Sequence, residues 1–379
     1  MPLTPIALPG NRPPDRFYAG GARIAEFRGV PWTGGNLPED WIGATNTLHG
    51  EDVLGLSVLP DGSLLRDAVQ ADPVAWLGPA HVARFGADTK LLTKLLDAGQ
   101  RLPVHVHPDS AFAAQHLGRT HGKTEAWVIL RGGSVHLGFE QALPRDEVHR
   151  LVRDQDVEPL LSAMHRFEVA PGDAVLVPAR MPHAIGEGVF LVEVQEPEDL
   201  SILMEWRGFA IDGEREGHLG LGFEVALQAA DLTACSAEQV GRLVRRARGS
   251  GPVLPDRAAD FFRVDRISAG AVLDAGFGVV VVTGGRGRMR AEGGDEATPV
   301  CAGQTILGTP RGRRSGPGGR RRGRRPVVPA AGGGLIGTPG QSLASSPCGV
   351  SAGRSTSIRP ARRTPGAPSP GARRDLSAA

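Results

Sequence analysis

Two histidines separated by a single residue, His105 and His107, are the residues of this chain whose spacing most directly suggests chemistry. Side chains at positions i and i+2 of a β-strand point to the same face, so both imidazoles can reach one ion. Further along, Glu125 offers a carboxylate, and His183 closes a short apolar strand that is bounded by glycine and proline. Three imidazoles and one carboxylate suit a borderline divalent ion such as Zn, or Mn, Fe or Ni. The sequence therefore predicts a metal site at these four residues.

The order of these residues is more informative than any one of them. A single histidine on a strand is more often a hydrogen-bonded structural residue than a ligand. Here His-x-His is followed by a later Glu and then by Gly-x5-Pro-x4-His at 172–183. This is the two-part signature of the cupin barrel, whose inward-facing strands supply ligands. Because 17 residues separate His107 from Glu125, we expect an insertion with a helix at about 109–116 to loop out between two ligand strands.

Three segments resemble class I mannose-6-phosphate isomerases, namely VHVHPD at 104–109, GKTEAW at 122–127 and PHAIGEG at 182–188. The resemblance covers about 40–206, continues more weakly to about 307, and indicates a divergent, actinobacterial-like member. Three departures stand out. The first ligand position, normally a glutamine in that family, is His105, and Pro103 replaces a serine of the family pattern. The arginine that the family usually places shortly after the strand at 189–196 is absent from 199–206.

The resemblance implies a mainly β fold, a cupin jelly-roll barrel with helical insertions, that binds one divalent metal ion, with Zn first and Mn or Fe as alternatives. It implies aldose–ketose isomerisation of a phosphorylated hexose, most simply mannose 6-phosphate to fructose 6-phosphate through a cis-enediol. The metal ligands would be His105, His107, Glu125 and His183; the candidates for proton transfer are Lys123 and Glu193, and those for substrate binding are Lys94, Trp41 and Gln195.

Several of these residues also have a structural interpretation. Lys94 lies between Leu92 and Leu96 on one face of an expected strand at 90–97, where a buried ammonium requires a negative partner, and we expect the substrate phosphate or a sugar oxygen to be that partner. It could instead be a solvated charge on an edge strand. Trp41 could be a packing residue, and Glu193 a structural carboxylate paired with an arginine.

Two other function classes remain open. A metal-dependent cupin oxidase or dioxygenase uses a similar set of three histidines and one glutamate, and it requires a redox-active ion. A non-catalytic sugar-binding cupin would keep the site and show no turnover. The identity of the metal and the presence of Lys94 and Lys123 distinguish these classes, because isomerisation tolerates Zn and benefits from both lysines.

Hydrophobic periodicity and turn residues divide the chain into expected elements. We expect a strand at 23–27, and helices at 63–77 with Ser63 as cap and Pro73 as interruption, at 143–164 with an interruption near Pro159, and at 236–248 after a capping box. Residues 217–226 are expected to form a linker and a short strand. A second β unit is expected from strands at 261–267, 277–283, 287–291 and 304–307, and we expect it to shield the barrel.

The chain divides into three parts by composition. We expect a metal-binding cupin domain at 1–210, a smaller β domain at 211–307, and a tail at 308–379. The tail has 14 Arg, no Lys and one acid, a charge of +13 against −11 for the rest. Such a composition predicts disorder. A frameshift product, a nucleic-acid-binding tail and a solvated appendage are the competing explanations.

Composition also restricts location and partners. The 3 cysteines are too few and too scattered for a disulfide framework. No window approaches 18 apolar residues, and the N-terminus lacks a charged-then-apolar signal peptide. We therefore expect a cytoplasmic protein whose partner is a small sugar phosphate, with no membrane and with nucleic acid bound only non-specifically through the basic tail.

The tail generates a first prediction. Limited proteolysis near Arg311 should remove it and leave metal content unchanged, because no aromatic and few large apolar side chains follow Leu307. The melting temperature of the full chain should be compared with that of a truncation at Leu307 and of a version with the reading frame restored after Leu307. A higher melting temperature only in the restored version supports the frameshift; three equal values reject it. Loss of a salt-sensitive affinity for nucleic acid on truncation would instead support a binding tail.

Overall fold

Six antiparallel strands form the larger sheet of this protein. The structure is a computed structural model and describes residues 5–246, 249–273, 276–291 and 297–308. In spatial order the six strands are β12 (Val244–Arg245), β8 (Ala174–Val177), β5 (Glu125–Arg131), β10 (Phe190–Gln195), β3 (Leu92–Asp97) and β2 (Glu39–Ile42). Strand β10 lies near the centre and pairs with both β5 and β3.

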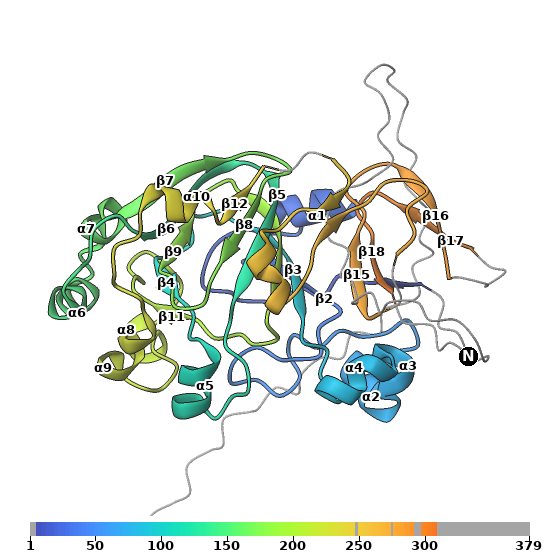
Figure 1. The fold of residues 1–379 in the computed structure, drawn as a ribbon, viewed down its shortest axis with the longest axis horizontal. Helices are drawn as coiled ribbons and strands as arrows, with labels where there is room; N and C mark the ends of the chain where they lie inside the picture. Colours follow the sequence, from blue (N-terminus) through green and yellow to red (C-terminus); the bar gives the residue numbers. More distant parts are fainter. Residues whose placement is uncertain (1–4, 247–248, 274–275, 292–296, 309–379) are drawn as a thin grey trace, which may run out of the picture. The chain divides into compact units, whose positions relative to one another are not determined.

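A second sheet has five strands and carries His105 and His183, while His107 directly follows the strand that holds His105. Its order is β11 (Ile202–Leu203), β4 (His105–Val106), β9 (His183–Ile185), β6 (Gly133–Phe139) and β7 (Met164–Val169). Figure 1 shows this sheet beside the larger one, with β4 and β9 near β5 and β8. The mainly β class is confirmed, and two antiparallel sheets of this kind are the layers of a jelly roll.

Alternation along the strands separates a polar inner row from an apolar outer face. Lys94 on β3 lies opposite both Glu193 on β10 and Trp41 on β2, and Gln195 lies opposite Glu125 on β5. Residues directly opposite one another in adjacent strands share a face. The polar side chains that the sequence assigned to four separate segments therefore form one row across the larger sheet.

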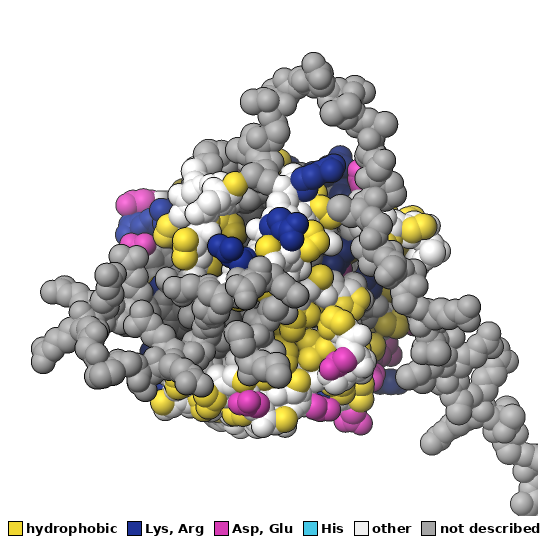
Figure 2. Space-filling model, turned by 90° about the vertical axis from the view of Figure 1, so that its right-hand side faces the viewer, with side chains coloured by type: hydrophobic (Ala, Val, Ile, Leu, Met, Phe, Trp, Pro, Cys, Tyr) yellow, Lys and Arg dark blue, Asp and Glu magenta, His cyan; other side chains and the backbone are white. Residues whose placement is uncertain are grey.

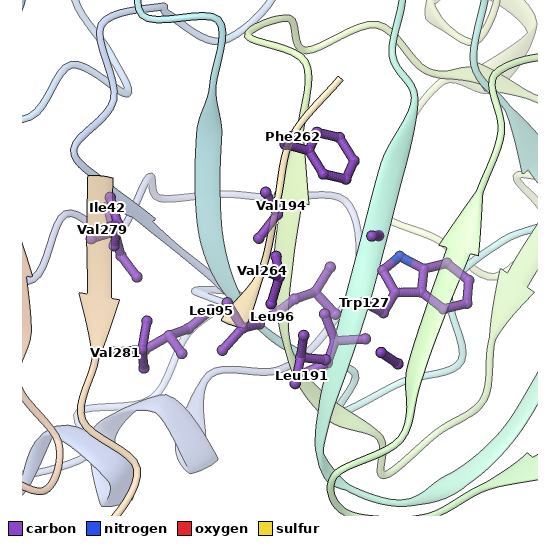
Figure 3. Packing of buried hydrophobic residues seen from close by; sticks show 14 of the residues in the cluster. Ile42, Leu95, Leu96, Trp127, Leu191, Val194, Phe262, Val264, Val279 and Val281 are labelled. Carbon is purple, nitrogen blue, oxygen red and sulfur yellow. The ribbon is translucent and has the colours of Figure 1, made fainter. Parts of the chain in front are cut away.

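The opposite face of the larger sheet is covered by residues from the C-terminal part of the chain. Figure 3 shows Val279 and Val281 near Ile42 and Leu95, and Phe262 and Val264 near Val194. All belong to one cluster of buried hydrophobic residues. The second β unit does pack against the barrel, as the sequence predicts.

Three small sheets complete this second unit. They are β1 (Ile6–Leu8), β18 (Thr305–Gly308) and β15 (Gly278–Val281); β13 (Gly251–Pro252) and β14 (Asp265–Arg266); and β16 (Arg286–Arg290) and β17 (Ala297–Cys301). Figure 2 shows the molecule from this side, with several basic side chains in the upper part of the face and acidic ones both along its lower edge and at the upper left. The expected strands at 277–283, 287–291 and 304–307 are present, the one at 261–267 shrinks to β14, and β17 was not predicted.

Ten short α-helices occur in the described part of the chain. They are α1 (Ala22–Arg28), α2 (Leu65–Ala71), α3 (Pro73–Leu77), α4 (Pro79–Phe85), α5 (Ser110–Leu117), α6 (Arg145–Asp154), α7 (Val157–Ser162), α8 (Gly213–Glu216), α9 (Phe223–Ala226) and α10 (Ala237–Gly241), with 3-10 turns at Leu227–Ala229 and Asp256–Asp260. Helix α5 is the insertion expected between the ligand strands, and the Asp109 side chain caps it by accepting from the Phe112 N–H at 2.8 Å.

Two expected strands are helices instead. Residues 23–27 lie in α1, which is bounded by Gly21 and Gly29 at φ 112° and 66°, backbone conformations that glycine adopts without strain. A segment of five residues is too short for its periodicity to separate a helix from a strand. Residues 217–226, expected to end in a strand, end in α9.

Three helix boundaries also differ from expectation. Pro159 lies inside α7 and does not interrupt it, because it is the third residue of the helix, where the N–H has no intrahelical partner. The break falls at Gln155, with φ 52°. Ser63 caps nothing, since α2 begins after Leu64 without a side-chain cap. The capping box at Ser236 is confirmed, but α10 ends at Gly241 because 244–245 join the larger sheet.

The expected boundary near residue 210 is crossed in both directions. Strand β12 follows it and pairs with β8 of the larger sheet, while β1 precedes it and pairs with β18. The division into domains therefore stays a prediction. The tail at 308–379 lies outside the described residues, apart from Gly308 at the end of β18. None of the described helices has the length and apolarity needed to cross a membrane.

Packing between the two units generates a second prediction. Leu95 has no exposed surface and lies in the main hydrophobic cluster. Leu95→Ala should lower the free energy of unfolding by about 2–5 kcal/mol, the usual effect of a cavity at a buried leucine. Val272→Ala is the control, because that side chain is 93% exposed and its loss should change stability by less than about 0.5 kcal/mol. Equal urea midpoints for the two variants would contradict this packing.

Candidate metal centre

The three histidines are brought together by the pairing of two strands. His105 of β4 lies directly opposite His183 of β9, and their ring centroids are 4.0 Å apart. His107 lies 5.0 Å and 4.8 Å from the same two rings. Each of the three rings offers one nitrogen that could bind a metal, and these three nitrogens lie within 4.8 Å of one another. One small ion can therefore contact all three.

Backbone carbonyls set the orientation of each ring. The Nδ1 atoms of His105, His107 and His183 lie 2.8, 2.7 and 2.8 Å from the carbonyl oxygens of Pro103, Leu200 and Met181, respectively. A carbonyl only accepts, so each Nδ1 donates and each Nε2 keeps its lone pair for a ligand. Burial and the neighbouring rings lower the pKa of His105 well below its ordinary value, and burial with Lys123 lowers the pKa of His107 to about 3. Both rings are thus neutral, as metal binding requires.

Glu125 supplies an oxygen at the same place. Its Oε2 atom lies 3.0 Å from His107 Nε2, and its Oε1 atom lies 3.4 Å from His183 Nε2. Burial opposes its ionisation, but Lys123 and His107 outweigh burial and hold the pKa of Glu125 well below its usual range. The Oε2 atom and His183 Nε2 are buried and accept no hydrogen bond from the described residues, although the Lys123 ammonium lies 3.1 Å from Oε2. Buried acceptors that converge in this way fit a cation, so the four predicted ligands are compatible with one divalent ion.

Lys123 lies in the same interior. Its Nζ atom is 3.1 Å from Glu125 Oε2 and 3.0 Å from His107 Nε2. The side chain is 5% exposed. The sequence placed Lys123 on the ligand-bearing side of its strand, and the structure confirms that position.

Lys94 is surrounded by three carboxylates. Its Nζ atom lies 3.4 Å from Glu39, 3.5 Å from Glu193 and 3.7 Å from Asp199. Burial would lower the pKa of this ammonium, but the three carboxylates raise it above its ordinary value. Lys94 therefore remains charged in the interior, and the alternative of a solvated edge lysine is wrong.

Four members of this cluster, Arg16, Tyr18, Glu39 and Asp199, were not among the site residues predicted from the sequence. Arg16 Nε donates to Glu39 Oε1 at 3.1 Å, its Nη2 lies 3.8 Å from Asp199, and Tyr18 Oη donates to Glu39 at 2.8 Å. Glu39 and Asp199 are ionised, because the charges of Arg16 and Lys94 outweigh burial and lower the pKa of both carboxyls. The N-terminal segment that holds Arg16 carries no motif, so no pattern in the sequence identifies it.

Glu193 differs from the other carboxyls of the cluster. Burial and the nearby charge of Glu125 raise its pKa to about 7, although Lys94 acts in the opposite direction. Its Oε2 atom has no hydrogen-bond partner in the described residues. A carboxyl that is half protonated near neutral pH is suited to exchange protons with a ligand. Its ion-pair partner is Lys94, so the alternative of a carboxylate paired with an arginine does not describe it.

The two remaining candidates have contrasting surroundings. Gln195 is buried opposite Glu125, and its amide donates to the Glu196 and Glu198 carbonyls, while its Oε1 has no partner in the described part of the chain. Trp41 has no exposed surface; its indole N–H donates to Glu39 at 2.7 Å, and its ring lies 4.6 Å from Lys94 Nζ. Trp41 thus contacts and orients two charged residues, Glu39 and Lys94.

Comparison with known proteins identifies relatives of part of this chain. No family model matches it. The mannose-6-phosphate isomerase of Streptococcus mutans is 35% identical over 153 residues, which is 38% of this chain and 47% of that protein. A mannose-6-phosphate isomerase of Bacillus subtilis is 35% identical over 140 residues, 36% of this chain and 43% of that protein. The chain spans about half the length of the curated relatives it matches.

Solved structures extend the likeness of fold over most of the chain. Mannose 6-phosphate isomerase from Bacillus subtilis superimposes with a TM-score of 0.57 at 20% identity, covering 80% of this chain and 93% of that one. A variant of phosphomannose isomerase from Salmonella typhimurium gives 0.61 at 16% identity, covering 81% and 95%. The cupin barrel with a second β unit, expected from the sequence, is confirmed as the fold.

The donor set generates a third prediction. His107→Ala and His183→Ala should each lose the bound metal, measured by elemental analysis after dialysis, while the far-ultraviolet circular dichroism stays unchanged, because the core does not depend on the ion. His105→Gln should keep the metal with lower affinity, because an amide oxygen replaces an imidazole. Full metal content in both alanine variants would reject the assignment, and loss of all metal from His105→Gln would mean that His105 does not take the place of the family glutamine.

Proposed function

We propose that this chain, which is related in sequence to mannose-6-phosphate isomerases and shares their fold, is a metal-dependent aldose–ketose isomerase that interconverts mannose 6-phosphate and fructose 6-phosphate. The observation that carries the proposal is the interior row itself. Three imidazoles and Glu125 converge on one point, and Glu193, with a pKa of about 7, lies opposite Lys94 in the same interior.

The metal ion would be held by His105, His107, Glu125 and His183. When bound, it supplies positive charge that polarises the substrate carbonyl and holds the adjacent hydroxyl oxygen. Zn is the first choice, with Mn or Fe as alternatives, because all three accept imidazole and carboxylate ligands. The carbonyls behind the three rings keep the Nε2 atoms directed at the ion.

Glu193 is the residue we assign to proton transfer. As a carboxylate it removes the proton from C2 of the aldose, and the resulting acid returns that proton to C1, while the O2 hydroxyl proton moves to O1 through the cis-enediol. Lys123 stabilises negative charge that develops on the sugar oxygens, because its ammonium is buried beside Glu125.

Lys94 and Gln195 would contact the sugar. Lys94 lies opposite Glu193 and keeps its charge, so it can donate to a sugar oxygen and lower the pKa of Glu193 at the same time. The free Oε1 of Gln195 can accept from a sugar hydroxyl. Trp41 acts through Lys94 and Glu39 and not by direct contact. The cytoplasmic location expected from the sequence is part of this proposal.

A cupin oxidase or dioxygenase is the second candidate, and His105 is the observation that favours it. Three histidines and one glutamate also suit a redox-active ion. The deciding experiment is an assay of chelated protein restored with Zn, Mn or Fe, against hexose 6-phosphates, with oxygen uptake recorded. Ketose formation with Zn and no oxygen uptake supports the isomerase; oxygen uptake only with Fe supports the oxidase; and neither activity, with sugar binding retained, indicates a sugar-binding module.

The raised pKa of Glu193 generates a fourth prediction. In the metal-loaded protein kcat/KM should fall as pH decreases through the pKa of Glu193, because protonation removes the base. Lys94→Met removes a positive charge that lowers the pKa of Glu193, so the midpoint of this acidic limb should move to higher pH. Lys94→Arg keeps the charge and is the control. A midpoint that stays in place or moves to lower pH in Lys94→Met would contradict the assignment of Glu193 as base.

A further inference from the structure

The use of lysine in this chain is unusual. Of 43 basic residues only 3 are lysines, Lys90, Lys94 and Lys123, and the others are arginines. Lys94 and Lys123 lie in the interior already described. A compact ammonium is not interchangeable with a guanidinium. Lys90 is therefore the one lysine of the chain that the proposed mechanism does not use.

Strand register places Lys90 at the end of the barrel where Glu125, a proposed metal ligand, lies. Gln195, the last residue of β10, lies opposite both Leu92, the first residue of β3, and Glu125, the first residue of β5. The loops that precede β3 and β5 therefore leave the same end of the larger sheet, beside the proposed ligand Glu125. Lys90 lies on the first of these loops, and His121 lies on the second.

Lys90, His121 and Asp88 form a connected group, which we call the rim group. His121 donates from Nε2 to Asp88 at 2.6 Å, and Lys90 Nζ donates to His121 Nδ1 at 3.0 Å. The His121 side chain is 10% exposed, whereas Lys90 is 32% exposed. The buried ring thus holds an ammonium whose remaining N–H bonds can meet a ligand from solvent.

The interior is a poor place for a phosphate dianion. Lys94 already has three carboxylates within 3.7 Å, so an added dianion would be repelled by Glu39, Glu193 and Asp199. The arginine expected after β10 is absent from 199–206. The sugar can enter this interior with its hydroxyl groups, but its phosphate requires a cation elsewhere, at a point that solvent can reach.

We propose that Lys90 binds the phosphate group of the substrate, with His121 and Asp88 positioning its ammonium. This inference rests on the proposed function for the identity of the substrate, and it assigns the charged end of a hexose phosphate to the rim group while C1 and C2 lie at the metal centre. Lysine binds phosphate as a point charge, which suits one donor on a loop. The alternative is a purely structural role. Lys90 would then form an ion pair with Asp88 that stabilises the loop, and its Nζ atom would pack 5.6 Å from the centre of the Phe85 ring.

The experiment compares Lys90→Met and Lys90→Gln with the parent full-length chain. Inorganic phosphate binding is measured by calorimetry, with the metal present and after chelation, because phosphate can also bind a metal ion directly. KM and kcat for mannose 6-phosphate are measured on the metal-loaded protein. Arg166→Met is the matched control: it also removes one positive charge, its side chain is 60% exposed, and it lies on β7, in the other sheet.

Both Lys90 variants should weaken phosphate binding and raise KM by about 10- to 100-fold, the loss expected for a hydrogen bond to a charged group, with kcat changed less than about threefold. Arg166→Met should behave as the parent does. Lys90 variants that match Arg166→Met in phosphate binding and KM overturn the inference and leave the proposed function intact. A parent that binds phosphate through Lys90 but forms no ketose overturns the proposed function and leaves the anion site. Unfolding of both Lys90 variants, seen by circular dichroism, would support the structural alternative and reject the inference.

Discussion

Strand β10 is the element on which the site depends, because its backbone hydrogen bonds hold β5 on one side and β3 on the other. Those two ladders align Glu193 with Lys94 and Gln195 with Glu125. A slip of one residue in either pairing would turn the polar side chains to the outer face and bring Val194 and Leu95 inside. The apolar cover contributed by Val264 and Val281 makes such a slip unfavourable, because it would bury charges against hydrocarbon.

The need to balance buried charges explains why carboxylates and cations lie together in the interior. An ammonium at the position of Lys94 is tolerated only with carboxylates around it, and three of them surround it. Arg16 supplies a second cation, so Glu39 and Asp199 can both remain ionised. For Glu193, burial and the nearby charge of Glu125 outweigh the opposing effect of Lys94, so its pKa rises to about 7. A carboxyl suited to proton transfer is thus a consequence of how charge is balanced in the barrel.

The ends of the chain contribute to this interior although they contain no site motif. Arg16 and Tyr18 reach Glu39 from the segment before α1. The preceding strand, β1, pairs with β18, whose residues lie about 300 positions away in sequence. The second unit therefore holds the N-terminal segment in place as well as covering the larger sheet. Its role is to exclude water from the outer face and to keep a cation beside the cluster.

The sequence by itself determined the metal centre and the fold class. The two-residue period of a strand placed His105 and His107 on one face, the order of the motif added His183, and short apolar or alternating segments marked β3, β8 and β10. Local patterns failed where a segment was short, as in α1 and α9, since few residues cannot separate two periods. The partners of Lys94, the pKa of Glu193 and the contact of Lys90 with His121 were decided by the tertiary structure alone. Each of them depends on side chains that are distant in sequence and meet only when β2, β3, β5 and β10 are hydrogen-bonded side by side.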